Sequence, residues 1–251
     1  MINVLINGAN GRMGKKVFEC ATLSQRVNAV CGVDVKADYS NPNYPIFPSF
    51  SDVVERIDVV IDFSSPSCLD NILEFCKKNS CGAILCTTGY SDSDIEKIKK
   101  ASEDIAIFRS GNMSLGINLL INLVKKATST LYGFDVEIIE KHHNQKVDAP
   151  SGTALMLAEA VKEVDGEKFF NYGREGLCGK RDKNEIGIHA VRGGTIVGEH
   201  DVIFAGNNET ITLSHQASDR SVFANGAITA SVYIASKKQG LYDMSDVIEQ
   251  R

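Results

Sequence analysis

The segment that most constrains the fold is a glycine-rich turn near the N-terminus. A short apolar run, residues 2–6, precedes glycines at positions 8, 11 and 14, and residues 12 to about 23 have a helical pattern. A strand, a glycine turn and a helix in this order are a variant of the dinucleotide-binding fingerprint. Glycines let the backbone approach a pyrophosphate, and the helix start offers free N–H groups to it.

A carboxylate follows the second predicted strand. The apolar run at residues 27–33 ends at Asp34, about 20 residues after Gly14, where such folds bind the adenosine ribose hydroxyls. The charge of Asp34 repels a 2′-phosphate and therefore favours NADH. Lys36 offsets part of that repulsion, so NADPH remains possible.

The first half of the chain alternates between strand and helix patterns. Strand-like runs at residues 58–63, 82–86 and 105–108 are separated by helical patterns at 67–78 and 91–102, while residues 41–48 have the composition of an extended surface loop. Alternation of this kind predicts a doubly wound parallel sheet, an α/β fold. Ligands on such sheets bind at the carboxyl ends of the strands, where the loops at 8–14, 63–66, 87–89 and 110–114 lie.

The pattern changes after residue 114. A helix is predicted for residues 115–131, with one apolar face formed by Leu119, Leu120, Leu123 and Val124, and a strand is predicted for residues 135–140. Ser151 is a possible N-cap of the next helix. The apolar stripe expected on that helix comprises Ala154, Leu157, Ala158, Val161 and Val164.

The most informative chemistry lies between this strand and this helix, at residues 140–154. The segment holds His142, His143, Lys146 and a helix start, which together are suited to hold an anion and to donate a proton to it. If the strand continues through the two histidines, they point to opposite faces and only one faces a given cleft. The alternative is that Ser151 only caps its helix and Lys146 is solvated.

The remaining chain predicts a second, α+β domain. Strand-like runs occupy residues 187–191, 195–200, 201–204 and 209–215, and a small-residue helix at 223–237 is expected to return to the first domain. The long gaps between His189, His200 and His215 argue against a metal site. One face of an antiparallel sheet is free for subunit packing.

Bulk properties exclude several classes of protein. A length of 251 residues suits one large or two small domains, and a net charge of −5 argues against a nucleic-acid-binding surface. No signal peptide and no apolar stretch of transmembrane length is recognisable. The seven cysteines form no C-x-x-C pair, which fits a reducing compartment, and a cytoplasmic location is expected.

Four segments carry a family resemblance: residues 8–14, residues 140–154, residues 192–200 and residues 218–227. With them the chain resembles dihydrodipicolinate reductase over nearly its whole length. The resemblance implies a Rossmann-like doubly wound sheet and an α+β domain with a mixed sheet. Residues 1–113 and 221–251 would bind the dinucleotide, and residues 114–220 would bind substrate and form a homotetramer.

The same resemblance implies a reaction and roles for individual residues. The reaction is NAD(P)H-dependent reduction of a small dicarboxylate, 4-hydroxy-tetrahydrodipicolinate, in lysine and diaminopimelate biosynthesis, without metal, nucleic acid or membrane. His142 resembles the general acid and Lys146 its partner, and His143, Ser151, Gly152 and Thr153 resemble substrate-binding positions. The implied cofactor positions are Gly8, Asn10, Gly11, Arg12, Met13, Gly14, Asp34, Lys36, Phe63, Ser64, Thr87, Thr88, Gly89, Asn112 and Met113.

Two departures and two rival functions remain. Asn144 and Gln145 replace a more basic pair found in some family members, and no arginine directly follows Asp34. One rival is a dehydrogenase of another amino or sugar acid, which shares the dinucleotide fingerprint but does not require the histidine cluster. The other is a non-catalytic NADH sensor, which would need a partner-binding module.

Overall fold

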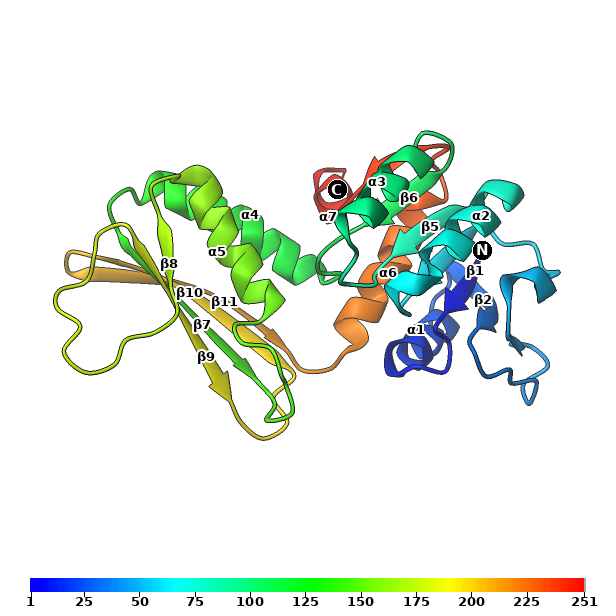
Figure 1. The fold of residues 1–251 in the computed structure, drawn as a ribbon, viewed down its shortest axis with the longest axis horizontal. Coiled ribbons are helices and arrows are strands. Elements are labelled where there is room, and N and C mark those ends of the chain that lie inside the picture. The colour runs from blue at the N-terminus through cyan, green and yellow to red at the C-terminus, as the bar shows by residue number, and fades with distance from the viewer. Residues whose placement is uncertain (251) are drawn as a thin grey trace. The chain divides into compact units, whose positions relative to one another are not determined.

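The computed structural model describes residues 1–250, which form two compact units (Figure 1). Unit 1 comprises Met1–Leu115 and the C-terminal segment that begins at Arg220, and unit 2 comprises Gly116–Asp219. Within residues 1–250, no helix is both long and apolar enough to span a membrane.

Unit 1 is built on a seven-stranded sheet in the order β12-β6-β5-β4-β1-β2-β3. Every pairing in it is parallel, which confirms the predicted doubly wound sheet. The strands are β1 (Ile2–Asn7), β2 (Val27–Val33), β3 (Ile46–Phe47), β4 (Val59–Asp62), β5 (Gly82–Leu85), β6 (Ala106–Arg109) and β12 (Gly240–Tyr242).

Helices cover both faces of this sheet, which explains why its strands are apolar runs and not alternating patterns. In β1, Val4 and Ile6 join the core on one face while Leu5 joins the core on the other, and all three are fully buried. The helices of unit 1 are α1 (Arg12–Thr22), α2 (Leu69–Asn79), α3 (Asp92–Ala101), α6 (Ser221–Ile234) and α7 (Met244–Glu249). The predicted return of α6 to the first domain is confirmed by its packing in the core with β1 and α1.

The connection from β2 to β4 has no α-helix. It contains only the two-residue strand β3 and the 3₁₀ turn η1 (Phe50–Asp52), and a second turn, η2 (Pro66–Cys68), precedes α2. The extended loop predicted for residues 41–48 is therefore correct except that β3 adds a short strand to the sheet edge.

Unit 2 contains a five-stranded sheet in the order β11-β10-β7-β9-β8. It is mixed, as expected, because β9 pairs in parallel with β7 and β8 while β10 is antiparallel to β7 and β11. The strands are β7 (Asp135–His142), β8 (Phe169–Asn171), β9 (Glu185–Arg192), β10 (Gly198–Gly206) and β11 (Glu209–Ala217). The two runs predicted at 195–200 and 201–204 are thus one strand.

Two helices, α4 (Leu115–Thr130) and α5 (Gly152–Val164), cover one face of this sheet (Figure 1). On α4, Leu120 and Val124 are buried, but Leu119 and Leu123 are 50% and 46% exposed, so the prediction that these four residues form one apolar face was wrong. Each exposed leucine precedes a buried residue by one position, about 100° around the helix. Val164, the last residue of α5, is also exposed.

Candidate functional site

The glycine turn of unit 1 requires glycine for steric reasons. Gly8 has φ +77°, and a Cβ there would lie 2.7 Å from the carbonyl oxygen of Phe63. A Cβ on Gly14 would lie 2.2 Å from the carbonyl oxygen of Gly8. Gly11 is the N-cap of α1 and has no side chain to cap it, so the first N–H groups of α1 are left for an anionic ligand.

Asp34 is held against this turn by backbone donors. Its carboxylate accepts hydrogen bonds from the backbone N–H of Asn10 (3.0 Å) and of Lys36 (3.3 Å). The side-chain amide of Asn10 donates to the Lys36 carbonyl oxygen at 2.7 Å. The glycine turn and the end of β2 are therefore joined, and the carboxylate is fixed where a ribose would bind.

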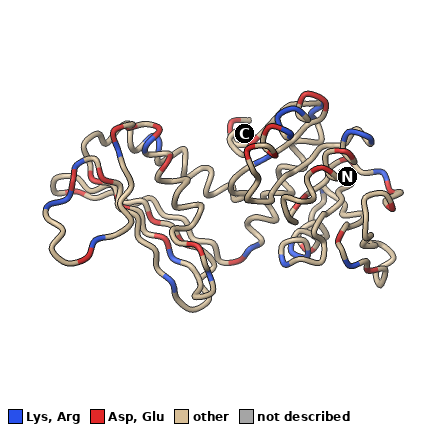
Figure 2. Tube along the Cα trace, in the orientation of Figure 1, with Lys and Arg blue, Asp and Glu red and all other residues tan. Residues whose placement is uncertain are grey.

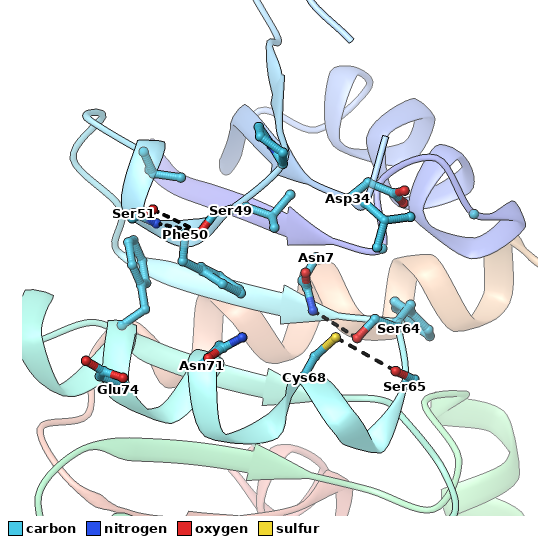
Figure 3. Close-up of a pocket in the computed structure, with 18 of the residues that line it drawn as sticks. Asn7, Asp34, Ser49, Phe50, Ser51, Ser64, Ser65, Cys68, Asn71 and Glu74 are labelled. Carbon is cyan, nitrogen blue, oxygen red and sulfur yellow. Dashed lines mark hydrogen bonds between the residues drawn. The ribbon is translucent and has the colours of Figure 1, made fainter. Parts of the chain in front are cut away.

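A cavity of about 670 Å³ opens beside the turn, within the size range of cofactor sites. Five predicted cofactor residues line it: Gly8, Gly11, Asp34, Phe63 and Ser64. It continues between η1 and α2, with Asp34 toward one end and Glu74 toward the other (Figure 3). Glycine backbone, a carboxylate and apolar walls in one cavity fit a dinucleotide.

A buried carboxylate, Asp62, ties the loops beneath this cavity together. It accepts hydrogen bonds from Asn7 Nδ2 (2.8 Å), Thr87 Oγ1 (2.7 Å), Tyr90 OH (3.3 Å) and Ser64 Oγ. These partners join the carboxyl ends of β1, β4 and β5. Burial, together with the charge of Asp62, raises the pKa of Tyr90.

The other predicted cofactor residues lie around this centre. Arg12, Thr88 and Gly89 are exposed and do not line the cavity. Asn112 shapes its own turn, since its Oδ1 accepts the N–H of Ser114 at 2.8 Å. Met113 is buried against α6, where a Cβ on Gly226 would lie 1.7 Å from its carbonyl oxygen.

The centre of the candidate site in unit 2 is a second buried carboxylate, Glu140. It lies on the helix-covered face of β7, two residues after the core residue Ile138, and has no exposed surface. His142 Nδ1 lies 2.7 Å from one oxygen, and the backbone N–H of Ser151 donates to the other at 2.9 Å. Arg192, the partner of His142 in the β7–β9 pairing, donates to both oxygens at 2.7 and 2.8 Å.

These contacts determine the charge of Glu140. Burial by itself raises the pKa of Glu140, but the hydrogen bonds from Arg192, His142 and Ser151 outweigh burial and hold the pKa below its usual value. Arg192 also donates to the carbonyl oxygen of Asp148 at 2.7 Å, so the same guanidinium fixes the loop before α5.

The other edge of the His142 ring faces Gly198 and His200. A Cβ on Gly198 would lie 3.1 Å from His142 Nε2, and the His200 ring packs edge-on with centroids 5.3 Å apart. His200 Nε2 lies 3.0 Å from Ser151 Oγ. Burial, and next the neighbouring His142, lowers the pKa of His200 to about 4, so His200 is neutral at pH 7.

The predicted substrate residues occupy different environments. Ser151 is buried, and its Oγ accepts the N–H of Ala154 at 3.2 Å, which confirms the predicted N-cap. Gly152 is exposed and Thr153 half-buried in the first turn of α5. Lys146 pairs with Asp148 at 2.9 Å. His143 is half-buried, and its carbonyl oxygen accepts the Lys146 N–H at 3.1 Å.

Several of these groups were not predicted from the sequence. Glu140 lies inside the histidine segment, and Arg192 and His200 lie in the third family segment, but none was assigned a role. Asp62 and Asn7 lie at the carboxyl ends of predicted strands, and this position could have identified them as residues near the ligand site.

Comparison with family models matches both halves of the chain. Residues 2–113 match "Dihydrodipicolinate reductase, N-terminus" and residues 116–248 match "Dihydrodipicolinate reductase, C-terminus". A 4-hydroxy-tetrahydrodipicolinate reductase of Clostridium novyi is 49% identical, with 100% of each chain covered. One of Caldanaerobacter subterraneus is also 49% identical, with 100% of this chain and 99% of the relative covered.

Solved structures agree with this match. The dipicolinate-bound dihydrodipicolinate reductase from Paenisporosarcina sp. TG-14 superposes with a TM-score of 0.81, 26% identity and 97% coverage of both chains. A myo-inositol 2-dehydrogenase from Lactobacillus plantarum superposes with a TM-score of 0.63 at 9% identity, covering 98% of this chain and 93% of that one. The second likeness shows a shared fold alone.

Proposed function

The chain belongs to the dihydrodipicolinate reductase family, and we propose that His142, Lys146 and the start of α5 form its substrate site. It is an NAD(P)H-dependent oxidoreductase that reduces 4-hydroxy-tetrahydrodipicolinate to tetrahydrodipicolinate in lysine and diaminopimelate biosynthesis. This reaction is favoured over the rival dehydrogenase and sensor functions, because full-length relatives share it.

We assign the cofactor to residues 1–113 and 221–251. The glycine turn and the first N–H groups of α1 would hold the pyrophosphate, and the anchored carboxylate of Asp34 would accept the ribose hydroxyls. The bound nicotinamide supplies the hydride. Because Asp34 is negatively charged and no arginine follows it, we propose a preference for NADH.

We assign the substrate to residues 114–220. A dicarboxylate needs cationic and N–H donors, and we assign the backbone N–H groups in the first turn of α5, at Gly152 and Thr153, to one of its carboxylates. Lys146 supplies a positive charge after it exchanges Asp148 for a substrate carboxylate. His143 lies in the same loop and would contact the other end of the substrate.

His142 is the proposed general acid. Hydride addition to the conjugated ring leaves negative charge that a positioned proton donor must neutralise. Histidine is suited to this task because it gains and loses a proton near neutral pH. The proposal is supported by the shared contact of Glu140 with the His142 ring and the Ser151 N–H, because it joins the proposed acid to the helix start that we assign to the substrate.

We further propose a cytoplasmic homotetramer that assembles through the sheet of unit 2. The face of that sheet away from α4 and α5 carries Glu137, Lys141, His189 and Asp201, in ion pairs and hydrogen bonds. Acidic and basic residues are interspersed along these strands (Figure 2). Sedimentation equilibrium of the purified protein tests the state, and a monomeric mass would contradict it.

A coupled assay tests the function. Purified protein is mixed with dihydrodipicolinate synthase, pyruvate and aspartate semialdehyde, and oxidation of NADH or NADPH is followed in parallel. We expect oxidation that depends on the synthase, is inhibited by dipicolinate and is faster with NADH. Binding of both cofactors without any oxidation would instead support a sensor or another substrate.

A further inference from the structure

The Glu140 carboxylate determines which nitrogen of the neutral His142 ring carries the proton. An ionised carboxylate accepts hydrogen bonds and donates none, so the short contact to His142 Nδ1 requires a proton on that nitrogen. Nε2 is then the nitrogen that gains and releases a proton. Gly198 lies on the Nε2 side of the ring, and because it has no Cβ it leaves space there; a Cβ at this position would lie only 3.1 Å from Nε2.

Arg192 keeps Glu140 in the acceptor state. Its guanidinium donates to both carboxylate oxygens, and the Ser151 N–H adds a third donor that cannot reverse its direction. These two donors from Arg192, the Ser151 N–H and the His142 N–H stabilise the ionised form of Glu140, so the proton stays on His142. The same four donors hold its side chain in one rotamer inside the protein.

From this geometry we propose that Glu140 is a positioning residue that fixes the tautomer and direction of His142, with Arg192 holding Glu140 in place. The proposal rests on the assignment of His142 as the general acid. Glu140 itself has no exposed surface with which to contact a substrate, so we expect its effect on turnover to pass through the histidine.

Glu140→Gln tests this because glutamine keeps the shape but replaces one acceptor oxygen with a donor NH₂. Whichever way the amide turns, that NH₂ meets Arg192 and either Ser151 or His142, so at least the contact with Arg192 becomes repulsive. We expect kcat to fall about 10- to 100-fold while KM for NADH changes less than about twofold.

A double mutant separates positioning from general structural damage. In a His142→Gln background, Glu140→Gln should cost less than about twofold more in kcat, because the residue it positions is gone. A further 10-fold loss in that background would overturn the proposal. If His142→Gln alone leaves kcat unchanged, the assignment of the acid fails instead, and the two failures are distinguishable.

The matched control is Glu137→Gln on the same strand and the opposite face. Glu137 also accepts from a histidine, His189 at 2.8 Å, and from an arginine, Arg181 at 2.9 Å. It should leave kcat within about twofold of wild type at equal oligomeric state. An equal loss of kcat in both variants would overturn a specific role for Glu140.

An NMR spectrum of the wild-type protein tests the tautomer of His142 directly, without a variant that has to fold. The chain has five histidines, so a ¹⁵N-histidine sample gives a spectrum simple enough to assign. Neutral His142 should carry its proton on Nδ1. A proton on Nε2 in the neutral form would overturn the proposal.

Discussion

Asp62 in unit 1 and Glu140 in unit 2 are both carboxylates without exposed surface, yet their partners differ in kind. Apart from the backbone N–H of Ser64, Asp62 accepts from neutral side-chain hydroxyl and amide groups, such as Thr87 and Asn7. Glu140 accepts from an arginine, a histidine and a backbone N–H. The first set connects loop ends beneath a binding cavity, and the second set balances a charge beside His142, the proposed general acid.

The two sets of partners indicate different roles for the two buried carboxylates. Hydroxyl groups both donate and accept, so Thr87 and Tyr90 can turn to suit a change in Asp62. Arginine and backbone N–H groups only donate, so Arg192 and the Ser151 N–H cannot adapt in this way to a change in Glu140. We therefore read Asp62 as structural support for cofactor loops and Glu140 as part of the proton-transfer apparatus.

The largest effect is expected at His142, the proposed general acid. His142→Gln should lower kcat by about 10²–10⁴-fold, the usual contribution of a general acid, while NADH affinity stays within about twofold because its proposed site lies in unit 1. Steady-state kinetics and a fluorescence titration with NADH measure the two quantities. A kcat close to wild type would remove His142 from the acid role.

The stability of the protein should also fall in acid because of His200, the histidine that packs against His142. The pKa of His200 is about 4 in the folded protein against 6.5 for a free histidine, so the unfolded chain binds the extra proton first. Stability should therefore fall as pH drops from about 6.5 to 4, by about 3 kcal/mol. Urea denaturation at several pH values measures this, and His200→Asn should flatten the curve in that window.

Glu137 is the comparison group, because its effect on stability belongs mainly to a lower pH range than that of His200. The pKa of Glu137 is lowered to about 2, because hydrogen bonds from Arg174, His189 and Arg181 outweigh the opposing effect of burial. Its contribution is present above about pH 4.5 and is lost only as pH falls toward 2. An unchanged slope between pH 6.5 and 4 in His200→Asn would show that another group is responsible.

Substitution of Lys146 should have an intermediate effect on the kinetics. Lys146→Ala removes a charge that we assign to a substrate carboxylate, so KM for substrate should rise about 10-fold and kcat should fall, as a charged hydrogen bond of about 1.5–3 kcal/mol is lost. Asp148→Asn is the matched control, because it removes only the partner that Lys146 has at 2.9 Å. Wild-type kinetics for Lys146→Ala would exclude the anchoring role.

The smallest effect is expected at Asp62. In Asp62→Asn the new NH₂ can take the position that faces Thr87 and Tyr90, whose hydroxyls turn to accept it. We expect a loss of about 1 kcal/mol in unfolding free energy, against about 3 kcal/mol for Glu140→Gln, where a buried charge pair is broken. Equal losses in urea denaturation would show that the rotation of hydroxyls does not explain the difference.

Local features of this chain were predictable from its sequence because they depend on neighbouring residues. The glycine turn after β1, the alternation of strands and helices and the Ser151 cap all follow from backbone sterics and periodicity over a few residues. The apolar faces were predicted less well, since spacing alone did not separate Leu119 from Leu120.

Tertiary structure alone decided which polar groups meet. Asp62 bonds to Asn7 across 55 positions, and Arg192 bonds to Glu140 across 52. A buried carboxylate must find donors, but its own sequence neighbourhood does not say which ones. The strand order supplies them: β1 lies beside β4 in one sheet, and β9 lies beside β7 in the other. The sequence thus determined the types of groups present, and the pairing of distant strands determined their partners.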